Sequence, residues 1–188
     1  MLKEVLKKYI DAYCKVYEDE WKSLPKLPYD EDEPSNLYVG EINEDGWIQW
    51  QYVTVDRIID FSGLEKEYNI HFSEELKEYY NSYYFLDLCG FWNNRCITLD
   101  KIDNTIDVLE DFRCELDDNG KTMITIGTDS CNCLIGVKID SGQVVLCDWE
   151  NEEEFVLFDS LTEFFSKLKV RKDCKEQEFN SIDFAESC

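Results

Sequence analysis

The C-terminal third of the chain carries the pattern that most narrows the possible folds. Hydrophobic and polar residues alternate over residues 134–139, Asp140-Ser141-Gly142 is a turn signal, and residues 143–149 return, which predicts an antiparallel hairpin. Residues 155–158 predict a further strand. Ser160-Leu161-Thr162-Glu163 has the spacing of a capping box, so we expect the last helix to begin there.

The N-terminal part combines a long helix with a hairpin. Apolar residues recur at helical spacing over residues 2–20, which predicts a first helix with lysines on its wetter side. Prolines between residues 25 and 34 predict an extended connector. Asp45-Gly46 is a hairpin turn signal, and the strand that follows over residues 47–53 alternates, which leaves Trp47 on its polar face.

The middle of the chain predicts short helices between strands. A first helix contains Ile58 and Tyr68, and a second begins after an N-cap at Ser73. Strands are expected over residues 84–88 and 95–99, and a further helix is capped by Asn104 or Thr105.

Together these elements predict an α+β domain, with helices packed on one face of a mostly antiparallel sheet. The other face of the sheet is then free to become a concave binding surface. We assign residues 1–168 to this single domain. Residues 169–188 lose the periodicity and are expected to form a flexible C-terminal tail.

Negative charge is the main compositional feature, because 42 acidic residues face 19 basic ones, a net charge of −23. Residues 1–29 are nearly balanced, so the surplus lies beyond them, with runs at residues 30–33, 115–118 and 148–154. Self-repulsion makes such a surplus costly for folding, but the same charge attracts a basic partner. Nucleic acid and anionic membrane surfaces are excluded as partners, since both require Lys and Arg clusters.

Neither export nor membrane insertion is expected. The N-terminus lacks the apolar stretch of a signal peptide, and no segment approaches the ~20 apolar residues of a membrane span, so a cytoplasmic location is predicted. Nine cysteines are then expected to be mostly free thiols. Cys131 and Cys133 are spaced too closely for a zinc knuckle, and we predict no metal or other cofactor.

Enzymatic function has little support in the sequence. The single histidine, His71, lies between two predicted helices and is expected to be a packed loop residue. A Cys–His pair with Cys89 or Cys147 lacks any local signature, and no EF-hand spacing accompanies the acids of residues 148–154. We assign no catalytic residue, and a thiol- or metal-dependent enzyme remains the weakest alternative.

Three segments resemble a known group of proteins. The stretch YIDAYCKVYEDEWKSLPKLPYDED with the following WIQWQYV resembles the start of the Syd family. LEKEYNIHFSEELKEYYNSYY resembles the helix–turn–helix element of the wider SUKH superfamily, and CLIGVKIDSGQVVLCDWENEEEFVLFDSLTEFFSKLK is similar to its closing hairpin, strand and helix. The resemblance covers residues 4–168. His71-Phe72-Ser73 replaces the proline-containing turn of many SUKH members, which favours the Syd branch.

The resemblance implies protein binding rather than catalysis. SUKH proteins serve as cytoplasmic immunity proteins that neutralise bacterial toxins, many of them nucleases, whereas Syd binds cytosolic loops of the SecY translocon at the inner membrane face. Both partners are basic where they are bound, because nucleases attract phosphate and cytosolic loops follow the positive-inside rule. We expect a toxin-neutralising immunity protein first and a SecY-binding regulator as the alternative, with the oligomeric state left open.

A partner-binding site of this kind needs acidic residues for steering and aromatic anchors for affinity. For each tryptophan, packing in the core is the competing interpretation. The candidate residues are the anchors Trp47, Trp92 and Trp149 and the acids Asp148, Glu150, Glu152, Glu153 and Glu154.

Overall fold

A computed structural model describes all residues except 32–34, 119, 121, 149–150, 152 and 171–188. Its helices are α1 (Leu2–Trp21), α2 (Ser62–Tyr68), α3 (Glu74–Tyr80), α4 (Val108–Asp118) and α5 (Leu161–Lys167). Its strands are β1 (Lys26–Pro28), β2 (Tyr38–Val39), β3 (Trp47–Trp50), β4 (Val53–Thr54), β5 (Tyr83–Tyr84), β6 (Leu88–Trp92), β7 (Arg95–Leu99), β8 (Met123–Asp129), β9 (Leu134–Lys138), β10 (Val144–Asp148) and β11 (Glu153–Phe158).

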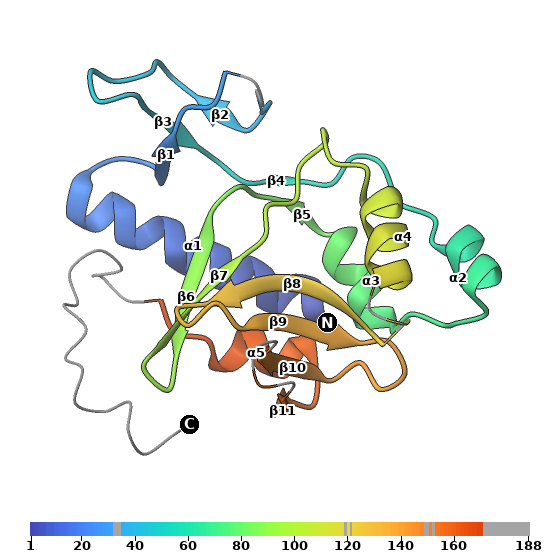
Figure 1. Cartoon of the computed structure of the whole chain (residues 1–188). Helices are drawn as coiled ribbons and strands as arrows, with labels where there is room; N and C mark the ends of the chain where they lie inside the picture. The colour runs from blue at the N-terminus through green and yellow to red at the C-terminus, as the bar shows by residue number, and fades with distance from the viewer. Residues whose placement is uncertain (32–34, 119, 121, 149–150, 152, 171–188) are drawn as a thin grey trace.

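The largest sheet, here called the main sheet, is an antiparallel meander. Within the described residues it contains the strands β11-β10-β9-β8-β7-β6 in that order, so strands consecutive in the chain are neighbours (Figure 1). The predicted hairpin is confirmed as β9 and β10, with Gly142 at a φ of 73° in its turn. β6 and β7 are joined by Asn93 and Asn94, which both have positive φ, as a tight hairpin turn requires.

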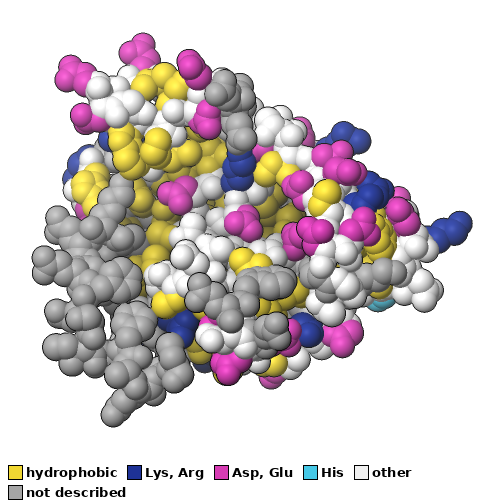
Figure 2. Space-filling model, in the orientation of Figure 1, with side chains coloured by type: hydrophobic (Ala, Val, Ile, Leu, Met, Phe, Trp, Pro, Cys, Tyr) yellow, Lys and Arg dark blue, Asp and Glu magenta, His cyan; other side chains and the backbone are white. Residues whose placement is uncertain are grey.

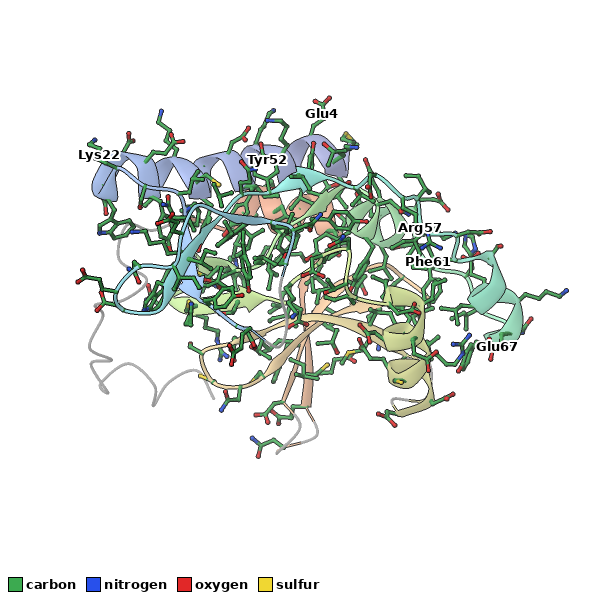
Figure 3. The ribbon with its side chains drawn as sticks, turned by 90° about the horizontal axis from the view of Figure 1, so that it is seen from above. Glu4, Lys22, Tyr52, Arg57, Phe61 and Glu67 are labelled. Carbon is green, nitrogen blue, oxygen red and sulfur yellow. The ribbon has the colours of Figure 1, made fainter. Side chains whose placement is uncertain are left out.

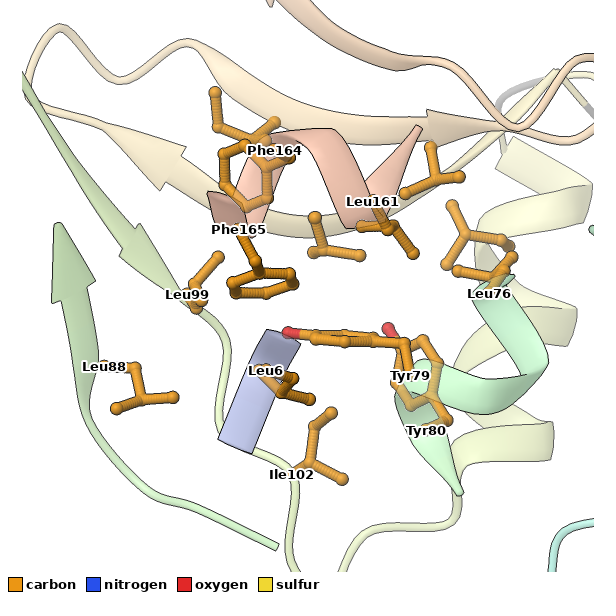
Figure 4. Packing of buried hydrophobic residues seen from close by; sticks show 14 of the residues in the cluster. Leu6, Leu76, Tyr79, Tyr80, Leu88, Leu99, Ile102, Leu161, Phe164 and Phe165 are labelled. Carbon is orange, nitrogen blue, oxygen red and sulfur yellow. The ribbon is translucent and has the colours of Figure 1, made fainter. Parts of the chain in front are cut away.

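One face of the main sheet is covered by α1, α3 and α5, which contact one another. The Tyr79 ring of α3 stacks on Phe165 of α5 with ring centroids 5.7 Å apart, and Leu6 of α1 packs beside them (Figure 4). Ser73 and Ser160 cap α3 and α5 through side-chain oxygens that accept N–H bonds, as predicted. The α+β architecture with helices on one face is therefore confirmed.

The other face, here called the open face, is bordered by α4. Register shows that β7 pairs only with the second half of β8, over residues 127–129. α4 lies beside the first half instead, and Glu115 Oε2 accepts the Thr125 N–H at 2.6 Å. A side chain thus satisfies a backbone donor that has no strand partner there.

A small sheet with the order β1-β3-β2, here called the lobe, stands beyond the upper ends of β6 and β7 (Figure 1). Trp50 of β3 is fully buried and faces Tyr13 of α1 at 6.4 Å between ring centroids, which fixes the lobe to the body. Tyr52 lies beside the middle of α1, between the ends marked by Glu4 and Lys22 (Figure 3), and its hydroxyl donates to Asp11.

Several predicted boundaries are wrong. β1 lies inside the expected connector, because Pro28 is tolerated in an edge strand. The strand expected over residues 84–88 is divided between β5 and β6. Ile58 is 70% exposed and lies outside α2, and α4 begins at Val108, where Asp107 accepts the Glu110 N–H.

Backbone pairing continues past residue 168. Lys169 exchanges two hydrogen bonds with Phe91 of β6, at 2.8 and 3.0 Å, and Val170 packs on the core. The rest of the predicted tail, residues 171–188, lies outside the described residues. Among those that are described, no helix combines the length and apolar character needed to cross a bilayer.

Gly90 is expected to be intolerant of a side chain. An added Cβ would collide with the hydroxyl of Tyr9, which donates to the Cys89 carbonyl, and would lie 2.5 Å from Leu168 Cγ. Gly90→Ala should therefore lower the free energy of unfolding by about 1–3 kcal/mol in urea titrations. Gly63→Ala is the matched control, because nothing lies within 4 Å of its new Cβ in α2. An equal loss in both variants would contradict the packing argument.

Candidate functional site

The open face is hollowed beneath the lobe. Figure 2 shows hydrophobic side chains at the bottom of this hollow, between the lobe and the upper ends of β6 and β7, with acidic side chains in it and along its edge. Alternation along the paired strands places Cys89, Cys96 and Thr98 on the open face, because Leu88, Ile97 and Leu99 point into the core. The hollow thus has β6 and β7 as its floor and the lobe above it (Figure 1, Figure 2).

A row of aromatic rings leads from the core to the surface at this end of the molecule. Trp50 and Tyr13 are buried, Tyr17 packs 5.3 Å from Tyr13, and Trp21 packs 4.8 Å from Tyr17 between ring centroids. Trp21 itself is 53% exposed at the end of α1. A large exposed ring held by a packed neighbour is typical of an interface anchor. Sequence reasoning missed Trp21, although Tyr13, Tyr17 and Trp21 recur every four residues.

Three carboxylates from two elements form a cluster, here called the acidic trio: Asp100, Asp111 and Glu115. Asp100 follows β7, and the other two belong to α4. Burial raises the pKa of all three carboxyls, and the negative charges of Asp100 and Asp111 further raise the pKa of Glu115. Desolvation therefore disfavours the ionised form of all three carboxyls, and repulsion within the trio adds to this effect at Glu115.

No cation of the described residues compensates the acidic trio. None of its three carboxylates forms an ion pair with Lys or Arg in that part of the chain, whereas Glu65 pairs with Lys77 at 2.8 Å. The last turn of α4 also lacks a basic residue, although the helix dipole favours cations there. The trio is thus an electrostatically unfavourable site that a cation from outside would relieve.

The described members of the predicted acidic run, Asp148, Glu153 and Glu154, belong to β10 and β11, at the edge of the main sheet far from the lobe (Figure 1). Asp148 accepts two hydrogen bonds from Asn151, Glu153 is exposed, and Glu154 is neutralised by Lys138 Nζ at 3.0 Å. Trp149, Glu150 and Glu152 lie outside the described residues.

The two predicted anchors that the structure describes lie apart. Trp47 is half-buried in β3 of the lobe, paired with Pro28. Trp92 ends β6 and packs edge-on against Phe158 at 5.1 Å, on the side of the main sheet that α5 covers. The structure therefore places Trp47 in the lobe, on the face of β3 opposite the buried Ile48 and Trp50, and Trp92 in the layer that α5 covers.

Groups suited to catalysis are sparse in the described residues. His71 is 75% exposed rather than packed as predicted, because its Nδ1 turns outward to Glu65 Oε1 at 3.0 Å. Its other contact is Glu74, at 3.9 Å. In the same described part, no group of three or more His, Cys, Asp or Glu side chains is arranged to hold a metal ion.

Two family models match the chain. Residues 3–110 match the model described as Syd protein (SUKH-2), and residues 57–167 match that of the SMI1 / KNR4 family (SUKH-1). Each match spans more than half of the 188 residues, and together they cover the lobe, the helices and the main sheet.

Proposed function

Because the chain belongs to the SUKH superfamily, in its Syd-like branch, we propose that it is a non-catalytic module that binds a basic protein on its open face. The SUKH and Syd families are binding and immunity proteins, which supports a protein partner. The function we favour is that of a cytoplasmic immunity protein that neutralises a basic bacterial toxin, with a nuclease as the expected class.

The acidic trio is the observation that carries this proposal. Its carboxylates have raised pKa values and no Lys or Arg partner in the described residues. Their ionised forms are therefore unfavourable in the folded protein, and a cationic group of a bound partner would stabilise them. A nuclease presents such cations, because its substrate site binds phosphate. Complementary charge also brings association rates toward about 10⁸–10⁹ M⁻¹ s⁻¹ at low salt.

Affinity then requires anchors beside the charges. We place Trp21 and Trp47 in this role, since both lie at the lobe end of the molecule and neither is fully buried. Asp148, Glu153 and Glu154 of β10 and β11 belong to a second proposed contact, whose other members, Trp149, Glu150 and Glu152, lie outside the described residues. Glu153 is its best-placed described member, because Glu154 already has Lys138.

A Syd-type regulator is the second candidate, and the match to the Syd model over residues 3–110 favours it. In this case the partner is the set of cytosolic loops of the SecY translocon, which are basic by the positive-inside rule. The same acidic trio and anchors suit a basic toxin and basic SecY loops equally well, so the binding surface alone does not distinguish the two functions.

One experiment separates the two. The chain is co-expressed with the protein encoded beside its own gene, and in parallel it is mixed at low salt with inverted membrane vesicles that contain SecY. A stable complex with the neighbouring product, and loss of that product's toxicity, supports immunity. Retention on SecY vesicles but not on SecY-depleted vesicles supports the regulator. Binding to neither would contradict the proposal.

Neutralising two members of the acidic trio should raise stability and lower partner affinity. Asp100→Asn with Glu115→Gln removes repulsion but retains an oxygen for the Thr125 N–H, so the free energy of unfolding should rise by about 0.5–1 kcal/mol. Affinity for the partner should fall at the same time. Glu4→Gln with Asp140→Asn, both exposed, is the control and should change neither quantity. A loss of stability in the first variant would contradict the assignment.

The same carboxyls predict how binding depends on pH. Their pKa values are raised in the folded protein, so their stabilising contribution is present at low pH and is lost as the pH rises through those values. Partner affinity should run in the opposite direction, because a basic partner needs the ionised forms. As the pH is lowered, calorimetric titration should therefore show affinity falling before the pH reaches about 4, the ordinary pKa of Asp and Glu. Constant affinity over that range would contradict the role of the trio.

A further inference from the structure

Two cysteines are neighbours on the open face. Cys89 pairs with Thr98 and Cys96 pairs with Phe91 across β6 and β7, so the two cysteines are diagonal neighbours whose side chains share a face. Both are half-buried, and none of the described cysteines forms a disulfide. Each thiol is therefore accessible to reagents in solution while it still contacts neighbouring side chains of the sheet.

The Cys89 side chain hydrogen-bonds to Cys96 and lowers the pKa of the Cys96 thiol to about 7. Partial burial and the carboxylate of Asp87 oppose this effect but are weaker. In Cys14 and Cys147, by contrast, burial raises the pKa, to about 11 in Cys14. A thiol is most reactive toward disulfides when its pKa lies near the ambient pH, which Cys96 satisfies.

The pair lies next to the hollow. Tyr13 faces Trp50 of the lobe, and burial raises the pKa of its hydroxyl, which is also close enough to Cys89 and Asp87 for their negative charges to raise that pKa further. Lys169 holds the outer edge of β6 at Phe91, directly across from Cys96. A group attached to Cys96 therefore projects from the sheet floor of the open face, next to Cys89.

We propose that Cys96 is a thiol-modification site for small disulfides of the glutathione class, activated by Cys89. The Cys96 thiolate attacks one sulfur of the disulfide and forms a new S–S bond, while the old S–S bond breaks and releases a thiolate that takes a proton from water. Cys96 and the departing sulfur exchange oxidation states, so no further oxidant is needed. Cys89 is a positioning residue that donates its S–H to the attacking sulfur.

The chemical part is tested with 5,5′-dithiobis(2-nitrobenzoate) on the full chain, with mass spectrometry to identify the labelled residue. The rate at Cys96 should reach half its plateau near pH 7, against about 8.5 for a cysteine in an unstructured, blocked peptide. Cys89→Ala should raise this midpoint by about one pH unit, and Cys89→Ser, which keeps a donor, should restore most of the shift. Cys114→Ser, at an exposed site on α4, should leave it unchanged.

A Cys96 midpoint at the value of the unstructured peptide, or no labelling of Cys96 in the folded protein, would show that Cys96 is not the proposed modification site. A consequence for binding rests on the proposed function: glutathione attached to Cys96 adds bulk and negative charge to the open face, so partner affinity should fall at least tenfold. Cys96→Ser treated with the same disulfide should keep its affinity. Unchanged affinity of the modified wild type would overturn this consequence, and the pH profile distinguishes that result from failure of the site.

Discussion

Replacing the acidic trio, Asp100, Asp111 and Glu115, with lysine is expected to slow association about 100-fold at low salt, for the partner identified by co-expression or vesicle binding. Steering by opposite charge accounts for roughly two decades of association rate, and the reversal turns attraction into repulsion where the partner docks. Dissociation should change less. Stopped-flow association at several salt concentrations measures the effect, which should shrink as salt screens the charges.

The control for this variant changes the net charge by the same amount elsewhere. Glu4, Glu74 and Asp140 are exposed and belong to α1, α3 and the β9–β10 turn, away from the trio. Lysine at these three positions should slow association by less than about threefold at about 0.15 M salt, where the Debye length is about 8 Å and charges on other elements are largely screened. Equal slowing in both variants would assign the effect to the total charge of −23 rather than to the trio.

The second large effect concerns stability. Asp129→Ala should lower the free energy of unfolding by about 3–5 kcal/mol, because it breaks a buried ion pair and leaves Arg95 without its partner. The Asp129 side chain is fully buried, accepts from Arg95 Nη1 at 2.6 Å, and also accepts the N–H groups of Cys131 and Cys133 at 2.8 and 2.9 Å. These bonds hold the β8–β9 turn closed.

Guanidinium titration followed by tryptophan fluorescence measures the loss, with the slope checked for two-state behaviour. Asp140→Ala is the control, since Asp140 is exposed in the neighbouring β9–β10 turn and should change stability by less than about 0.5 kcal/mol. A loss below about 1 kcal/mol for Asp129→Ala would show that the turn does not depend on this carboxylate.

The fold was predictable where local signals agreed with burial. Alternation over residues 134–149 and the Gly142 turn predicted β9 and β10, and the serine caps predicted the starts of α3 and α5. The failures have a physical cause. Residues 84–88 resemble a strand because they are mostly apolar. Phe85, however, is apolar because its side chain is buried in the core, and its backbone forms an isolated bridge with Ile102 rather than a strand. The Asn93-Asn94 pair is the turn signal that was missed; a hairpin turn there places β6 at Leu88–Trp92, C-terminal to the predicted strand.

The candidate site was less accessible from sequence. The acidic run at residues 115–118 contains one member of the trio, but Asp100 joins it only because α4 takes the position beside β8 that β7 leaves empty. Raised pKa values arise from that packing and have no local signature. Similarly, the diagonal placement of Cys89 and Cys96 depends on strand register, which the shifted β6 boundary concealed.

The location of the partner on the open face is tested most directly by hydrogen–deuterium exchange of the complex, compared with the free chain. Binding across the hollow and the trio should slow amide exchange in β6, β7, α4 and the end of α1, near Trp21. α5 and the first half of α1, which cover the opposite face, should exchange as in the free chain. Protection confined to those two segments, with none in β7 or α4, would contradict binding on the open face.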